Sequence, residues 1–165
     1  MSTLKEFLKE LHQESKVTRK MLERIPADKY EWQPHVKSMT IRRLSSHLEE
    51  LPQWITMAFT TNELNFATVP YEPVLWKDNL ELLDIFERSL AEATMHLEKG
   101  KEEELNPTWL LKNGDQVLVT MTKRELVRHA ISQTIHHRAQ LGVFLRLLDV
   151  PIPASYGPSA DENEF

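Results

Sequence analysis

The chain has 165 residues, of which 41% are hydrophobic and 27% are charged, so we expect one globular domain with a substantial core. Its formal net charge of −5 argues against general nucleic-acid binding, and the lack of cysteine excludes disulfides, thiolate ligands and a cysteine nucleophile. No apolar run approaches the roughly 18 residues that span a bilayer, and the charged N-terminus lacks the apolar core of a signal peptide. We therefore expect a cytoplasmic protein with no membrane partner.

Hydrophobic periodicity predicts four long helices. They cover residues of about 3–24, 40–63, 75–97 and 122–148. Thr40 is a suitable N-cap for the second helix. Pro52 lies inside the same helix, where it removes one backbone hydrogen bond. The fourth helix opens with Thr122 and Glu125 in the spacing of a capping box.

A different pattern precedes the fourth helix. Residues 109–120 place Asn113-Gly114 between two apolar runs, which predicts a short β-hairpin because both residues tolerate the positive φ of a tight turn. The polar tail, 155–165, is expected to be loosely held. The predicted fold class is all-α: a single domain over 1–165, built as a four-helix bundle with a short β-hairpin before the last helix.

Three histidines of the fourth helix are the candidate functional residues, because imidazole is the commonest protein ligand for borderline metals. At roughly 100° per residue, His137 falls on the apolar stripe with Gln133 beside it, whereas His129 and His136 fall on its flank or outside it. His47 lies at the edge of the stripe of the second helix. We hypothesise that His47 meets Gln133 and His137, whose i, i+4 spacing lets one helix grip one ion.

Other interpretations stay open. Gln133 and His137 also make sense as a hydrogen-bonded polar pair with no ligand. Glu49 or Glu50 is a candidate base beside a metal, although exposed charge on a helix face explains both residues at least as well. Arg138 is a candidate partner for a carboxylate or an anion, and it, His129 and His136 are candidates for groups that surround the ligands.

Several motifs resemble those of the DinB/YfiT-like superfamily of metal-binding four-helix bundles. The likeness covers nearly the whole chain. Its segments are Trp32-Gln-Pro, Leu44-Ser-Ser-His-Leu-Glu-Glu-Leu-Pro-Gln-Trp54, His136-His-Arg-Ala-Gln-Leu-Gly-Val-Phe-Leu-Arg146, Val150-Pro-Ile-Pro and Ser155-Tyr-Gly-Pro-Ser-Ala-Asp-Glu162.

The resemblance implies a divalent metal, zinc or nickel, held by one histidine of the second helix and two of the last. Matched motif to motif, these positions are His47, Gln133 and His137, so the glutamine departs from the pattern and implies a weak or absent metal. The implied function is a metal-dependent enzyme, a low-molecular-weight thiol transferase or a related hydrolase acting on a small molecule or thiol. The alternative is a non-catalytic, stress- or DNA-damage-associated bundle that serves as a binding or dimerisation module. In either case a homodimer is expected, and the catalytic residues are unknown.

Overall fold

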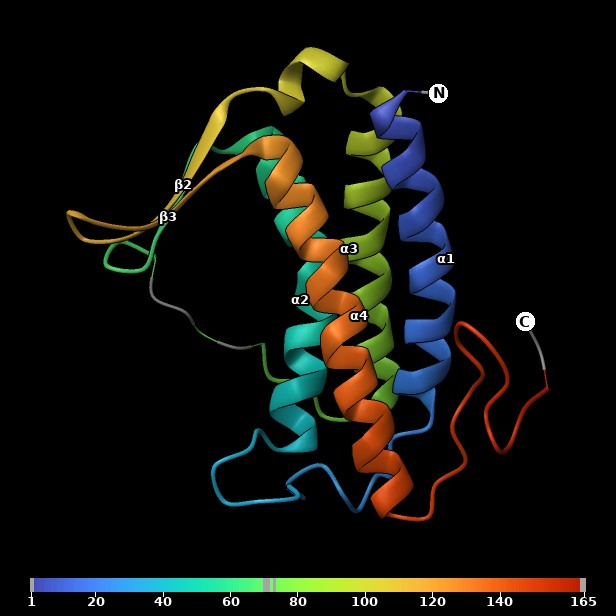
Figure 1. Ribbon diagram of the computed structural model, residues 1–165. Coiled ribbons are helices and arrows are strands. Elements are labelled where there is room, and N and C mark those ends of the chain that lie inside the picture. Colours follow the sequence, from blue (N-terminus) through green and yellow to red (C-terminus); the bar gives the residue numbers. More distant parts are fainter. Residues whose placement is uncertain (1, 70–71, 73, 164–165) are drawn as a thin grey trace.

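The computed structural model describes residues 2–69, 72 and 74–163. The chain is mainly helical, as predicted, and four long helices lie side by side (Figure 1). They are α1 (Thr3–Glu23), α2 (Ile41–Thr60), α3 (Asn79–Lys99) and α4 (Lys123–Leu147). Both α1 and α2 contact α3 and α4, so α4 shares one seam with α2 and another with α1. Among the described residues, no helix is long and apolar enough to cross a membrane.

Side-chain caps fix where the helices begin. The Thr40 side chain accepts a hydrogen bond from the Arg43 amide at the start of α2. Thr122 and Glu125 satisfy each other's backbone amides at the start of α4, which confirms the predicted capping box. These oxygens pair amide groups that have no partner inside the helix.

The sheet contains one strand that was not predicted. Its strands are β1 (Glu63–Asn65), β2 (Thr108–Asn113) and β3 (Gln116–Thr122), in the order β1-β2-β3, and a 3-10 helix, η1 (Glu102–Leu105), precedes β2. β2 and β3 are antiparallel, and Gly114 between them has a φ of 61°. The second helix was predicted to reach residue 63, but it ends at Thr60 because the following residues pair in parallel with β2.

Two further predictions are corrected. The third helix begins at Asn79 and not near residue 75, because the Asp78 side chain caps it, and Leu75 is 81% exposed. The tail is not loosely held over its described part. Glu162 forms an ion pair with Arg24 and accepts a hydrogen bond from the Ala154 amide, so the tail folds back on the end of α1.

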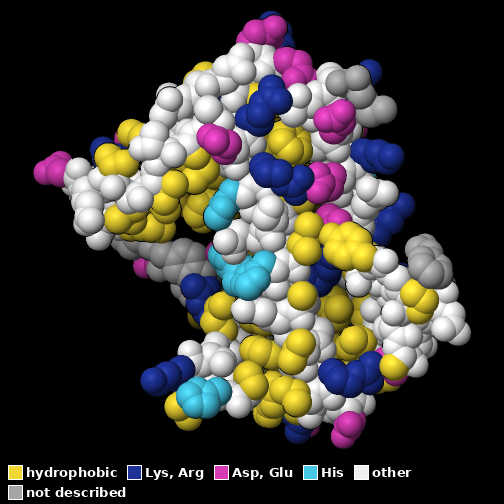
Figure 2. Space-filling model, viewed as in Figure 1, with side chains coloured by type: hydrophobic (Ala, Val, Ile, Leu, Met, Phe, Trp, Pro, Cys, Tyr) yellow, Lys and Arg dark blue, Asp and Glu magenta, His cyan; other side chains and the backbone are white. Residues whose placement is uncertain are grey.

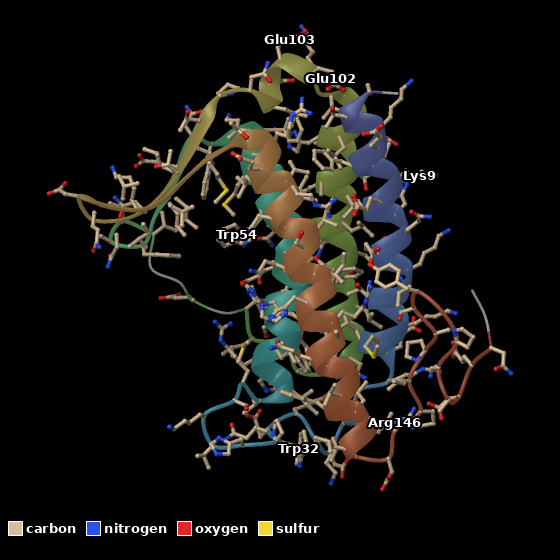
Figure 3. The ribbon with its side chains drawn as sticks, viewed as in Figure 1. Lys9, Trp32, Trp54, Glu102, Glu103 and Arg146 are labelled. Atoms are coloured by element: carbon tan, nitrogen blue, oxygen red, sulfur yellow. The ribbon has the colours of Figure 1, made fainter. Side chains whose placement is uncertain are left out.

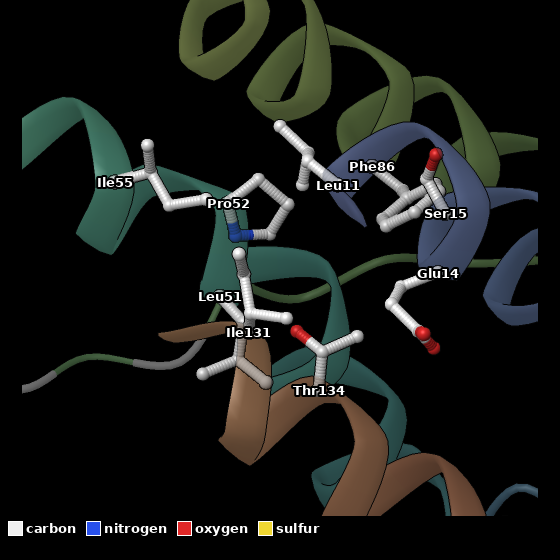
Figure 4. A pocket seen from close by; sticks show the side chains of 9 residues that line it. All are labelled: Leu11, Glu14, Ser15, Leu51, Pro52, Ile55, Phe86, Ile131 and Thr134. Atoms are coloured by element: carbon white, nitrogen blue, oxygen red, sulfur yellow. The ribbon is translucent and has the colours of Figure 1, made fainter. Parts of the chain in front are cut away.

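The core is closed between the helices. Trp76 and Trp109 are fully buried, and their indole nitrogens donate to Ser46 and Thr61 at the two ends of α2. A cavity of about 10 Å³ remains at Pro52, lined by side chains of all four helices (Figure 4). It is the size of one water molecule, so this interior space is too small for a substrate.

Candidate metal site between the second and fourth helices

The seam between α2 and α4 brings the predicted histidines together. The ring centroids of His47 and His137 are 4.6 Å apart, with an angle of 77° between the planes. Farther along the seam, Trp54 lies 6.1 Å from His129. The contact that lies later along α2 lies earlier along α4, so the two helices are antiparallel. Figure 2 shows histidine side chains gathered on one face of the molecule.

His137 is held in the neutral form. His137 is buried, with only 8% of its surface exposed. Burial lowers its pKa, and the neighbouring His47 and His136 lower it further, while the hydrogen bond to Gln140 acts in the opposite direction. Because a metal binds the neutral imidazole, this environment favours a ligand state at neutral pH.

Side-chain oxygens also determine which ring nitrogens are available. The Nδ1 of His47 lies 2.5 Å from Glu50 Oε1, and the Nδ1 of His137 lies 2.8 Å from Gln140 Oε1. A carboxylate or an amide oxygen only accepts, so each ring donates through Nδ1, and in its neutral form it keeps its lone pair on Nε2. This is the arrangement that orients metal-binding histidines.

Gln133 also lies at the seam between α2 and α4, but it does not complete a strong set of metal ligands. It is half-buried, one turn from both His129 and His137, so the antiparallel seam places it opposite the turn of α2 that contains Glu50. Across the described part of the chain, its amide takes part in no hydrogen bond. Those same residues contain no group of three or more His, Cys, Asp or Glu side chains that could hold a metal. The donor set fits a site with two imidazole nitrogens, and it does not fit one with three.

The other two histidines of α4 lie outside the pair. His136 is exposed, and its ring centroid lies 4.8 Å from that of His137. His129 is exposed as a residue, although desolvation of its ring and the charge of His47 lower its pKa. The predicted outward phase of both residues agrees with their exposure.

Arg138 contacts a different helix from the one expected for a group near the ligands. It is 3% exposed, and its Nη1 lies 2.6 Å from Glu14 Oε2 on α1. It also donates to the backbone oxygen of Glu14, while Tyr156 of the tail donates to Glu14 Oε1. The expected carboxylate partner is therefore present, but Arg138 joins α4 to α1 and does not surround the histidine pair.

Two carboxyl groups of α2 are less exposed than the sequence indicated. Glu50 is half-buried beside His47, and Glu49 is fully buried. Neither carboxyl oxygen of Glu49 has a hydrogen-bond partner among the described residues. Burial raises the pKa of Glu49 to about 7, the charge of Glu50 adds to this effect, and Arg88 opposes it. The neighbouring small residues Ser45 and Ser46 were the available signal that this face of α2 is buried.

A groove beside His47 also escaped the sequence analysis. Its volume is about 540 Å³, and it is lined by α2 and by residues that follow α2 in the chain. On α2 the lining residues recur at helical spacing: Arg43, His47, Glu50, Gln53, Trp54 and Met57. That spacing was visible in the sequence, but the opposite wall depends on where the chain goes after the helix ends.

Comparisons with known proteins agree with this fold. The sequence model of the DinB family matches residues 1–164. No curated protein matches the chain. A DinB-like protein from Bacillus subtilis is 19% identical, with a TM-score of 0.67 over 91% of this chain and 98% of that one. A proposed DinB-family member from Exiguobacterium sibiricum is 17% identical, with a TM-score of 0.70 over 93% and 97%.

A DinB-like protein from Bacillus cereus is 15% identical, with a TM-score of 0.65 over 91% of this chain and 95% of that one. At these identities the three structures show a shared fold and carry no information about substrate or metal. The family match, by contrast, spans almost every residue. The chain belongs to the DinB family.

Proposed function

We propose that this chain is a metal-dependent enzyme whose divalent ion, zinc or nickel, is bound by His47 and His137. The observation that carries the proposal is the contact between two half-buried or buried imidazoles whose Nδ1 atoms are both held by side-chain oxygens. Zinc–nitrogen bonds are about 2.0–2.1 Å long, so two rings that share one ion have to lie this close together. With Nδ1 held in this way, each ring in its neutral form presents Nε2 as the unprotonated atom that a metal needs.

The remaining coordination positions determine the strength and the use of the site. Zinc usually takes four ligands, so two histidines leave positions for Gln133, water or a substrate. A neutral amide is a weaker ligand than imidazole, and the affinity should be lower than that of a three-histidine site. A bound ion would lower the pKa of a coordinated thiol or water.

The protein side chains have defined tasks in this proposal. Glu50 and Gln140 orient the two ligands, and burial keeps His137 neutral. The groove beside His47 receives the substrate. The reaction is the conjugation of a low-molecular-weight thiol to an electrophile: a sulfur–carbon bond forms, the leaving group departs, and the thiol proton passes to water. Hydrolysis of a related electrophile by water is the other reaction of this type.

Gln133 favours a second candidate function. If the amide leaves the ion too weakly bound, the protein is a non-catalytic, stress-associated binding or dimerisation module. The described residues offer no third strong ligand, which supports this alternative. Cytoplasmic location and a homodimer stay predictions in both cases.

Metal titration of protein purified without an affinity tag and stripped with a chelator separates the two candidates. Zinc and nickel are titrated by calorimetry into wild type, His137→Ala and the matched control His136→Ala, which removes the adjacent exposed imidazole. We expect wild type and His136→Ala to bind about one ion per chain and His137→Ala to lose that binding. Equal binding by all three proteins rules out the proposed site.

Activity is then measured on the metal-loaded protein with a small thiol and monochlorobimane, whose conjugate is fluorescent. Metal-dependent turnover that disappears in His137→Ala supports the enzyme. Failure to bind the ion, or binding without conjugation or hydrolysis, supports the non-catalytic module.

A further inference from the structure

The groove beside His47 changes in character along its length. Arg43, His47 and Glu50 line one end of its α2 wall, and Trp54 and Met57 line the other. Gln53 lies between these two groups. At about 1.5 Å per residue, the ten residues from His47 to Met57 extend over roughly 15 Å. The polar end therefore contains one member of the histidine pair, and the apolar end begins about two turns away.

The chain that follows α2 supplies the second wall of the apolar end. Leu64 of β1 and Phe66 just beyond it line the groove opposite Trp54 and Met57. The backbone amide of Phe66 donates to the Lys112 oxygen, which ties this wall to the sheet. Figure 3 labels Trp54 at the seam below the sheet.

The apolar surface is held in place although it does not belong to the closed core. The ring of Trp54 lies 6.2 Å from Trp109, which is fully buried and donates to Thr61. Trp54 and Phe66 are each only half-buried. Two aromatic side chains thus keep part of their surface open to a hollow of about 540 Å³, within the roughly 300–1,000 Å³ of small-molecule sites.

We infer that this groove binds a small amphiphilic molecule with a flat aryl body and one polar, reactive group. The aryl body lies on Trp54, Met57 and Phe66, and the polar group lies at His47. The position of the polar group rests on the proposed function, because His47 is one of its two ligands. Trp54 follows His47 by seven positions, a rise of roughly 10 Å, which sets the distance between the polar group and the aryl body.

A second copy of the chain fits the groove less well as its occupant. Arg43, Glu50 and Glu72 all line the groove, so an apolar protein surface that filled it would have to desolvate three charged side chains. A molecule that is polar at one end and apolar at the other leaves those charges in contact with polar atoms or water. The polarity of the groove thus matches a ligand that is polar at one end only.

The probe for this inference is N-phenyl-1-naphthylamine, an uncharged aryl amine that fluoresces in apolar surroundings. It is titrated into chelator-treated wild type, Met57→Asp and the milder Met57→Gln. The matched control is Val143→Asp, which places the same charge in a separate groove of about 320 Å³, where Val143 is 59% exposed. Circular dichroism and thermal unfolding establish that each variant is folded.

We expect saturable binding with one probe per chain. Met57→Asp should weaken the affinity at least about tenfold, which corresponds to about 1.4 kcal/mol. Met57→Gln should weaken it less, and Val143→Asp should leave it unchanged. No saturation, or equal weakening by Val143→Asp and Met57→Asp, overturns the inference. Sedimentation of the same proteins adds a third test: a dimer that Met57→Asp dissociates would make a second copy the occupant and would also overturn it.

The outcome of the probe experiment does not depend on whether the protein binds a metal. The probe is measured without metal, and His137→Ala leaves the apolar end intact, so probe binding persists in that variant. Probe binding without zinc or nickel binding retains the aryl site and removes the proposed enzyme. Metal binding without probe binding does the reverse.

Discussion

Two adjacent residues of α4, His137 and Arg138, belong to two buried polar clusters with opposite properties. Arg138 faces α1, where Glu14 neutralises its charge and Tyr156 occupies the other carboxyl oxygen of Glu14. His137 faces α2, where its ring contacts that of His47 and keeps a lone pair on Nε2. Both clusters join α4 to a neighbouring helix, but only the second retains an atom that can bind a ligand.

The difference indicates how each cluster should respond to change. A buried charge without its partner is strongly destabilising, so the Arg138 cluster should control stability. The imidazole pair is less buried than the Arg138 ion pair and should contribute less to stability, so its loss should appear mainly in ligand binding. The same helix therefore carries a structural contact on one side and the candidate site on the other.

The largest expected effect is on the Arg138 cluster. Arg138→Met leaves Glu14 as an uncompensated buried charge, and we expect a loss of about 3–5 kcal/mol in the free energy of unfolding, measured by urea denaturation. The double variant with Glu14→Leu should recover most of the loss because neither charge is then buried. A single variant as stable as wild type would contradict the assigned role of the ion pair.

Glu49 extends the comparison to a buried carboxyl group that has no hydrogen-bond partner among the described residues. Its pKa is raised from 4.5 to about 7, so the folded state binds more protons than the unfolded state between these pH values. Its contribution to stability is fully present below pH 4.5 and is lost as the pH rises through 7. The loss amounts to something on the order of 3 kcal/mol.

Glu49→Gln isolates this effect from the other titrating groups. We expect the variant and wild type to have similar free energies of unfolding near pH 5, and the variant to be the more stable protein at pH 8. Urea denaturation of metal-free protein across this range measures the difference. A difference that does not change with pH would mean that Glu49 has a partner or solvent access in the folded state.

The sequence predicted the helices of this fold well. Periodicity located all four helices, and capping residues such as Thr122 marked their starts. β1 was missed because it is three residues long and its partner strand lies more than forty positions later, so no local period announces it. Leu75 was wrongly included in the third helix, since a leucine is not itself evidence of burial.

For the site, helical phase placed His137 inward and His136 outward, because that depends only on one helix. The partners of these residues could not be predicted in the same way. Arg138 and Glu14 are 124 positions apart, and their contact depends on how two helices pack. The groove likewise needs Phe66, whose position is set by pairing with the sheet. Both are properties of tertiary packing and not of local pattern.

A smaller effect is expected at the carboxylate that orients His47. Glu50→Gln replaces the acceptor that holds His47 Nδ1, and changes of this kind typically lower metal affinity about 10–100-fold. Zinc titration by calorimetry measures it. Glu72→Gln is the matched control, because it removes the same charge from the same groove without touching the ligand. Equal losses in the two variants would show that overall charge, and not the orientation of His47, governs affinity.

The smallest expected change adds a ligand to the open cluster. Gln133→His supplies a third imidazole one turn from His137, and zinc affinity should rise at least about tenfold, or 1.4 kcal/mol. Ser132→His is the control, since it adds the same side chain at an exposed position one residue out of phase. A gain in both variants would reflect surface binding. A gain in Gln133→His alone would show that the amide of Gln133 occupies the place where a third imidazole nitrogen completes the metal site.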